Sequence, residues 1–205
     1  NIKSGMKKRA SVIFIGFLLG AFGVGQYYAN LPQVYNYTGE DFTISDSISF
    51  PTKNIIKHET KEYRYRDTKD KVYNIWIHHL AVAPSSSVSA IANYHVNSHG
   101  WAGIGYHSGI AENGDVYIFN KLESISYHTR GQNTTGISIV LWGNYTDKYP
   151  TEEQIKSLEL VIEALEQSVK VGKISVHRHA PKAKTTCPGN YAVKTLEYYG
   201  ILRDN

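Results

Sequence analysis

From residue 71 to the end of the chain, apolar residues either cluster in short runs, as in buried strands, or recur at helical spacing. Residues Val72–His79 are rich in β-branched and aromatic side chains, which is typical of a buried strand. Gly136–Trp142 has the same character and suits a central strand, and Lys173–His177 predicts another. Between these two strands, apolar residues recur at helical spacing on one face: Ile155, Leu158, Val161, Ile162, Leu165 and Val169.

Local signals mark where the helices begin and end. Pro84 and the serines after it favour a helix start, and Gly100 ends that helix. Thr151 and Gln154 form a capping box in front of the long apolar face. A closing helix is expected over Tyr191–Tyr199. The first helix has apolar residues at helical spacing, namely Val88, Ile91, Ala92 and Val96.

One hairpin completes the set of elements. Asn113-Gly114 favours a tight turn between Tyr106–Ala111 and Asp115–Phe119. The expected order is therefore strand, helix, hairpin, strand, helix, strand, helix. This order predicts an α/β fold in which helices flank a mixed central β-sheet.

The amino-terminal residues 1–29 have the layout of a signal peptide or a signal anchor. The basic residues Lys7–Arg9 precede the apolar run Val12–Val24, which predicts a hydrophobic helix. Counted over residues 10–29, the run reaches the length of about 20 residues that spans a membrane, with its amino end inside. Gly23–Gly25 offers a cleavage site, and a buried core helix is the alternative interpretation. We expect an exported domain, either anchored to the membrane or free in the periplasmic or extracellular envelope.

The next segment, residues 30–70, is polar and mixed in composition. It is interpreted as a linker or amino-terminal extension with short strands around Asp41–Phe50 and Asn54–His58. Residues 71–205 would then form the domain that carries the chemistry.

Composition and charge narrow the possible partners. The chain has 205 residues, of which 41% are hydrophobic and 20% charged, as in an ordinary globular protein. Its net charge of +4 suits an anionic partner such as cell wall. There is no long basic run and no nucleic-acid-binding motif, so we expect no nucleic-acid partner. The only cysteine is Cys187, which excludes a disulfide within the chain. We expect a monomer.

Histidine pairs stand at the ends of two predicted strands, as His78-His79 and His177-x-His179, and Cys187 follows the second pair. Imidazole nitrogens and a thiolate are ligands that zinc prefers. Three protein ligands leave a fourth position open for water, and zinc lowers the pKa of such a water to near 7 and polarises a carbonyl group. Spacing alone makes this site a hypothesis, because the first histidine lies about a hundred residues from the others.

Six segments carry a resemblance to a known family. In chain order they are Ile75–Ala81, Gly100–His107, Gly109–Tyr117, Ser126–Gly131, Gly136–Gly143, and His177-Arg178 with Cys187-Pro188-Gly189. Together they resemble the type 2 N-acetylmuramoyl-L-alanine amidases, which include peptidoglycan recognition proteins and phage amidase endolysins. The resemblance covers roughly residues 72–200. It implies a zinc enzyme that hydrolyses the amide bond between N-acetylmuramic acid and L-alanine in peptidoglycan.

The resemblance also implies roles for single residues. His78, His177 and Cys187 would bind zinc, with His179 as the alternative second histidine because both spacings suit the family. On a strand, positions 177 and 179 would point to the same face, so geometry does not separate them. The neighbouring His79 would pack against the core.

The remaining roles concern catalysis and the substrate. Tyr106 would orient the attacking water or the carbonyl oxygen, and Thr185 would steady the oxyanion. His128, Arg130 and Asn133 would line the substrate cleft.

One departure from the family pattern refines the assignment. Intracellular recycling members carry a glutamate in the central strand, where this chain has Val140. This favours the branch of recognition proteins and phage enzymes. Two alternatives are a non-catalytic receptor that binds peptidoglycan on the same fold and an envelope protein that uses the domain as a wall anchor. Non-catalytic members typically lack the cysteine, which favours the enzyme here.

Overall fold

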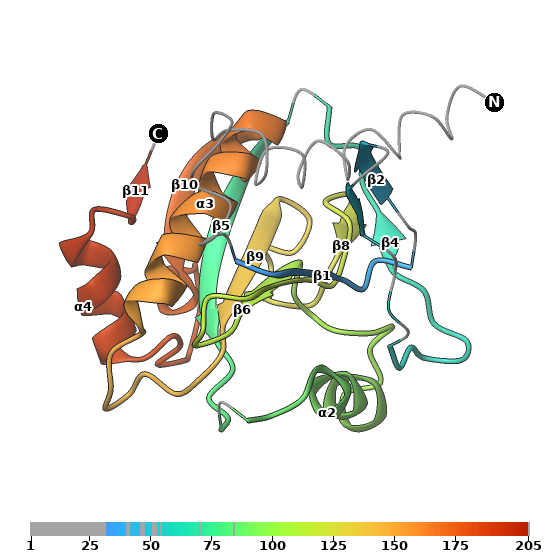
Figure 1. Cartoon of the computed structure of the whole chain (residues 1–205), viewed down its shortest axis with the longest axis horizontal. Coiled ribbons are helices and arrows are strands. Elements are labelled where there is room, and N and C mark those ends of the chain that lie inside the picture. The colour runs from blue at the N-terminus through green and yellow to red at the C-terminus, as the bar shows by residue number, and fades with distance from the viewer. Residues whose placement is uncertain are drawn as a thin grey trace.

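The chain folds around one mixed sheet, shown in the computed structural model in Figure 1. The structure describes residues 32–39, 42–45, 48–50, 53, 55–69, 71–83 and 85–204. Among these residues the main sheet has seven strands in the order β1-β7-β6-β9-β5-β10-β11. Their bounds are β1 Val34–Asn36, β7 Val116–Ile118, β6 Ser108–Ile110, β9 Gly136–Leu141, β5 Val72–His79, β10 Lys170–Val176 and β11 Arg203–Asp204.

The centre of this sheet is parallel and its edges are mixed. Strand β5 runs parallel to both β9 and β10, and β6 runs parallel to β9. The β6–β7 and β10–β11 pairs are antiparallel, and β1 adds a parallel edge beside β7. Two small antiparallel sheets pair β2 (Phe42–Ser45) with β3 (Ile48–Phe50) and β4 (Arg64–Tyr65) with β8 (Ser124–Ile125).

Helices cover both faces of the sheet. Helix α3 (Glu152–Ser168) lies along β5 and β10, and α4 (Asn190–Tyr198) lies beside it, whereas α2 (Val88–Asn93) lies beyond the opposite face (Figure 1). Helix α2 continues into the π-helical turn η2 (Tyr94–Ser98). Because both faces are covered, the central strands are apolar almost throughout instead of alternating with polar residues.

Alternation along β5 and β9 separates a structural face from a chemical face. Ile75 and Ile77 of β5 join the core cluster that contains the apolar face of α3. Val140 of β9 belongs to the other cluster, together with Ile91 of α2. Since His78 pairs with Val140 in register, its side chain lies on the α2 side of the sheet.

Most elements agree with the sequence predictions. Strand β5 has the predicted bounds, and the capping box of α3 forms, with Thr151 accepting from the Gln154 backbone N–H. The predicted turn has Gly114 at φ 87°, the left-handed region that favours glycine. The α/β fold with a mixed, helix-flanked sheet is therefore confirmed.

Two predictions of local structure were wrong, and some short strands were not predicted. Strand β10 ends at Val176, and His177–His179 form the short 3₁₀ helix η3 instead of continuing the strand. Residues 55–58 form no strand, while β1 and β4 were not predicted. Short edge strands are held by backbone pairing with distant segments, which leaves no apolar period in their own sequence.

The proposed signal or anchor segment, residues 1–29, lies outside the described residues. Within the part of the chain that the structure describes, no helix combines the length and apolar character needed to cross a membrane.

Candidate metal and catalytic site

His78, His177 and Cys187 come together at one edge of the sheet. One ligand atom from each side chain lies within 4.8 Å of the other two. The His78 Nδ1 and Cys187 Sγ atoms are 3.8 Å apart, and the rings of His78 and His177 have centroids 4.6 Å apart. His78 lies about a hundred residues before the other two in the sequence, so the fold brings it to them.

Strand order explains why the two histidines meet. Strands β5 and β10 are parallel neighbours in which Ile77 pairs with Val176, so their carboxyl ends reach the same edge. His78 is the next residue of β5, and His177 follows directly after β10. Each histidine therefore projects from the end of its strand toward the other.

The loop before α4 brings the cysteine to this edge. The Arg178 backbone N–H donates to the Cys187 carbonyl at 3.0 Å, and the His79 N–H points at the Cys187 sulfur at 3.4 Å. Gly189 allows the chain to turn here, because it has φ 97° and a Cβ atom would lie 2.2 Å from the Tyr145 carbonyl oxygen. Any other residue at position 189 would force this loop and the Tyr145 backbone apart.

The two neighbouring histidines, His79 and His179, point away from the metal cluster. His79 lies on the opposite face from His78, and its Nδ1 accepts from the Tyr145 backbone N–H at 3.3 Å, in the packing role expected for it. His179 is exposed. The expectation that His177 and His179 share a face was wrong, because successive residues of a 3₁₀ helix are about 120° apart. Only His177 joins the cluster with His78 and Cys187.

Burial keeps the clustered groups neutral. Desolvation lowers the pKa of His78 well below its usual value, and the nearby His128 and His177 add to this effect. Desolvation also lowers the pKa of His177. The pKa of Cys187 is raised to about 12 by burial, against the opposing effects of the His79 N–H and Arg178. Neutral imidazoles and a thiol that a dication would deprotonate fit a zinc ion.

The hydroxyl group of Thr129, a residue that was not predicted as part of the site, links the metal cluster to His128. Thr129 is 1% exposed, and its Oγ1 lies 3.3 Å from His78 Nε2 and 2.9 Å from His128 Nδ1. A metal bound by His78 Nδ1, the atom that faces the Cys187 sulfur, would leave the proton of this ring on Nε2. In that tautomer His78 Nε2–H donates to the Thr129 oxygen, and the Thr129 hydroxyl donates to His128 Nδ1.

This order of protons also defines the state of His128. With Nδ1 accepting from Thr129, the neutral ring carries its proton on Nε2. Burial lowers the pKa of His128 to about 3, so the ring is neutral at physiological pH. Among the described residues, the buried His128 Nε2 atom has no partner that meets hydrogen-bond geometry, although the Gly136 backbone lies close enough to the ring to oppose the fall of its pKa.

Tyr106 stands beside the metal cluster. Its ring centroid lies 5.3 Å from that of His78. Burial raises the pKa of the Tyr106 phenol, and the Cys187 thiol adds to this. The hydroxyl therefore stays protonated and can donate a hydrogen bond at neutral pH.

The other predicted residues lie in the surrounding loops. Thr185 is exposed, and its hydroxyl oxygen accepts from the Cys187 N–H at 3.1 Å. Asn133 is half-buried, and its Oδ1 accepts from the Thr129 N–H at 2.8 Å. Arg130 lies between Thr129 and Asn133 in the sequence, and its side chain is exposed. Asn133 thus holds the turn that carries Thr129, a structural contribution that the sequence did not reveal.

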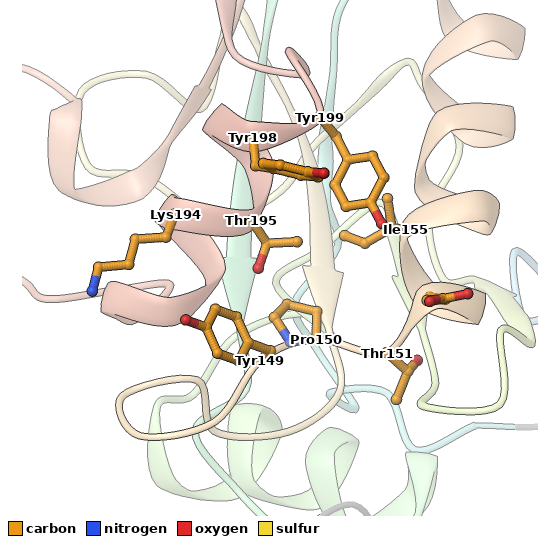
Figure 2. Close-up of a pocket in the computed structure, with 9 residues that line it drawn as sticks. Tyr149, Pro150, Thr151, Ile155, Lys194, Thr195, Tyr198 and Tyr199 are labelled. Carbon is orange, nitrogen blue, oxygen red and sulfur yellow. The ribbon is translucent and has the colours of Figure 1, made fainter.

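A separate pocket lies away from these residues. Figure 2 shows it between the start of α3 and helix α4, with Tyr149, Tyr198 and Tyr199 around its opening. Its volume is about 360 Å³, and none of the predicted site residues lines it.

Known proteins similar to this chain include an amidase, an endolysin and a peptidoglycan recognition protein. The chain is 26% identical over 129 residues to the human N-acetylmuramoyl-L-alanine amidase, a match that covers 57% of this chain and 22% of the human protein. It is 27% identical over 135 residues to the endolysin of Escherichia phage T7, covering 62% of this chain and 85% of the endolysin. The bumblebee PGRP-SA structure has the same fold, with a TM-score of 0.64 at 19% identity over 82% of this chain and 95% of that one.

A sequence model of the Amidase_2 family, described as N-acetylmuramoyl-L-alanine amidase, matches residues 68–190. This match includes the three clustered residues, Tyr106 and the loop with His128 and Thr129. Because it spans more than half of the chain, the resemblance inferred from the sequence is confirmed, and the chain belongs to the Amidase_2 family of N-acetylmuramoyl-L-alanine amidases.

Proposed function

We propose that this protein is a zinc-dependent amidase that cleaves the bond between the lactyl group of N-acetylmuramic acid and L-alanine in peptidoglycan. The observation that carries the proposal is the complete donor set of His78, His177 and Cys187, next to Tyr106 and the buried His128 Nε2. Two imidazoles and a thiolate leave one position free on a tetrahedral ion, as hydrolysis requires. When bound there, zinc supplies a Lewis acid that activates water and polarises a carbonyl group.

The protein's own residues then have distinct tasks. Tyr106 keeps its proton and can donate to the attacking water or to the substrate carbonyl oxygen. His128, in the loop between β8 and β9, can donate to the substrate through its Nε2–H, because Thr129 fixes its tautomer. His128 is buried and Tyr106 is half-buried, so their hydrogen bonds to developing negative charge would be stronger than in water.

Two further residues complete the proposed site. Thr185 precedes Cys187 in the loop at the rim, where its hydroxyl could donate to an oxyanion while its oxygen accepts from the Cys187 N–H. Arg130 is exposed in the His128 loop and could contact a carboxylate of the stem peptide. Both roles rest on position in the fold.

A non-catalytic peptidoglycan-binding protein is the second candidate, since the same fold occurs in recognition proteins such as bumblebee PGRP-SA. The intact set of three ligands favours catalysis, because binding alone does not need a metal with an open position.

Digestion of purified peptidoglycan separates the candidates. The amidase should release stem peptides that begin with a free L-alanine amino group, and removal of zinc by a chelator should stop this release. A binding protein would pellet with peptidoglycan without releasing any new amino group. New reducing sugar ends or cleavage within the stem peptide would assign a different bond and reject the proposal.

A further inference from the structure

Arg66 lies just before the segment that matches the family, and its guanidinium is buried against the loop that carries His128. The side chain is 8% exposed, and the family match begins at residue 68. Arg66 stacks over the Tyr73 ring, with its Cζ atom 4.6 Å from the ring centroid. Its backbone N–H also donates to the Glu123 carbonyl at 2.7 Å, next to the pairing of β4 with β8.

The guanidinium connects the segments on either side of the His128 loop, residues 126–135 between β8 and β9. Its Nε donates to a carbonyl oxygen just before β8, and its Nη1 lies within hydrogen-bond distance of three carbonyl oxygens at the end of the loop and the start of β9. The distances are 3.0 Å to Leu122, 3.0 Å to Asn133, 2.8 Å to Thr134 and 2.9 Å to Gly136. The forked shape of arginine allows one side chain to span both ends, which the single ammonium of lysine cannot do.

The residues between the carbonyl groups bound by Arg66 include those that contact the metal cluster. His128 and Thr129 lie inside the loop, and Thr129 contacts the proposed zinc ligand His78. The turn that holds them depends on the Gln132 N–H, which donates to the Thr129 carbonyl at 2.9 Å, and on Asn133. Asn133 also supplies one of the carbonyls bound by Arg66. The chain of contacts therefore runs from Arg66 through the loop ends to His128 and Thr129.

Burial of this cation is consistent with such a role. Desolvation lowers the pKa of Arg66 to about 10, against the opposing effects of Tyr73 and Glu123, so the group remains charged at neutral pH. A buried charge needs hydrogen-bond partners, and here most of these partners are carbonyl oxygens within or beside the His128 loop. The loop and the arginine thus hold each other in place.

We propose that Arg66 is a positioning residue that fixes the His128–Thr129 segment against the metal cluster, so that the chain before the matched family segment completes the site. This inference rests on the proposed function for its catalytic readout only. The order of the loop and the affinity of the protein for zinc test it independently of any activity.

The experiment compares Arg66→Met and Arg66→Lys in the full chain. Arg64 is an exposed arginine on β4, two residues before Arg66, so Arg64→Met is the matched control for lost charge. Leu165 is fully buried in α3, so Leu165→Ala is the control for lost stability away from the site. If Arg66→Met does not fold, Arg66→Lys keeps the charge but not the fork and carries the test.

The first readout is amide hydrogen exchange. We expect the Thr129 and Gln132 amides to exchange at least about tenfold faster in both Arg66 variants, while amides of α3 keep their wild-type rates. Zinc binding should weaken by up to about tenfold, since Thr129 would no longer hold His78. Unchanged exchange in the loop, or an equal increase throughout the domain as in Leu165→Ala, would overturn the proposal.

The second readout is a double-mutant cycle on turnover. Arg66→Met should lower kcat by at least about tenfold in the wild-type background, but by less than about twofold in a His128→Ala background. Equal losses in both backgrounds would mean that Arg66 does not act through His128 and would overturn the proposal. If the wild-type chain has no amidase activity, the proposed function fails, and hydrogen exchange and zinc affinity still decide the role of Arg66.

Discussion

Removing the Thr129 hydroxyl should weaken zinc binding although Thr129 is not a ligand. Thr129→Val keeps the branched shape of the side chain and deletes the oxygen that lies 3.3 Å from His78 Nε2 and 2.9 Å from His128 Nδ1. His78 would then lose the acceptor that fixes its tautomer and ring orientation. Loss of such a partner of a metal-binding histidine typically costs 10- to 100-fold in affinity, about 1.4–2.7 kcal/mol.

The same substitution should also lower the stability of the metal-free protein. Thr129 is 1% exposed, so the two imidazole nitrogens would be left without a partner in a buried position. A buried polar group without a partner costs about 1–3 kcal/mol in unfolding free energy. Thr129→Ser, which keeps the oxygen, should retain most of the zinc affinity and is the matched control.

The assay is a competition titration of metal-free protein against a chelator of known zinc affinity. Urea unfolding of the same samples confirms that each variant is folded under the conditions of the titration. Equal zinc dissociation constants for wild type, Thr129→Val and Thr129→Ser would refute the reasoning. Equal weakening in the valine and serine variants would also refute it, because the effect would then come from packing and not from the hydroxyl.

Three more predictions follow from the same geometry. His177→Ala should lose zinc and His179→Ala should keep it, as measured by elemental analysis, because only His177 lies in the cluster; the reverse result would move the ligand to His179. Tyr106→Phe should keep zinc and lose about a hundredfold in turnover, and unchanged turnover would make the hydroxyl structural. Burial lowers the pKa of His95 from 6.5 to about 4, so only the unfolded state gains its proton between these values. Stability should therefore fall as the pH drops below 6.5, by about 2 kcal/mol at pH 5 from this group. His95→Asn should reduce the difference between urea unfolding at pH 7 and pH 5, and an unchanged difference would contradict the shift.

The central strands and the long helix could be predicted because their apolar patterns extend over many consecutive residues. Strand β5 is rich in β-branched and aromatic residues, and α3 has both an apolar face and a capping box. His78 could be distinguished from His79 by family position, and alternation along β5 places the two rings on opposite faces.

The second histidine could not be settled in the same way. The sequence pattern predicts a strand through His177, and on such a strand His177 and His179 would share a face. The strand ends one residue earlier, and the 3₁₀ turn separates the two side chains. Where a strand ends depends here on the return of the chain toward Cys187, which leaves no local signal.

Thr129 and Arg66 were missed for different physical reasons. Thr129 follows His128 directly in the chain, but its hydroxyl matters only because the fold brings it to His78. Arg66 lies in a polar segment that was interpreted as a linker, and its partners begin 56 residues later, at Leu122. A charged residue in a polar segment gives no sequence signal that its side chain will be buried.

The most direct test of the central claim measures L-alanine amino ends released from purified peptidoglycan by zinc-loaded wild type and by Cys187→Ser. Both proteins are compared at equal folded concentration. We predict steady release by the wild type, and little or none by the variant, because serine replaces the thiolate that completes the donor set. Release at the same rate by both proteins would contradict the assignment of Cys187, and the absence of release by the wild type would contradict the proposed function.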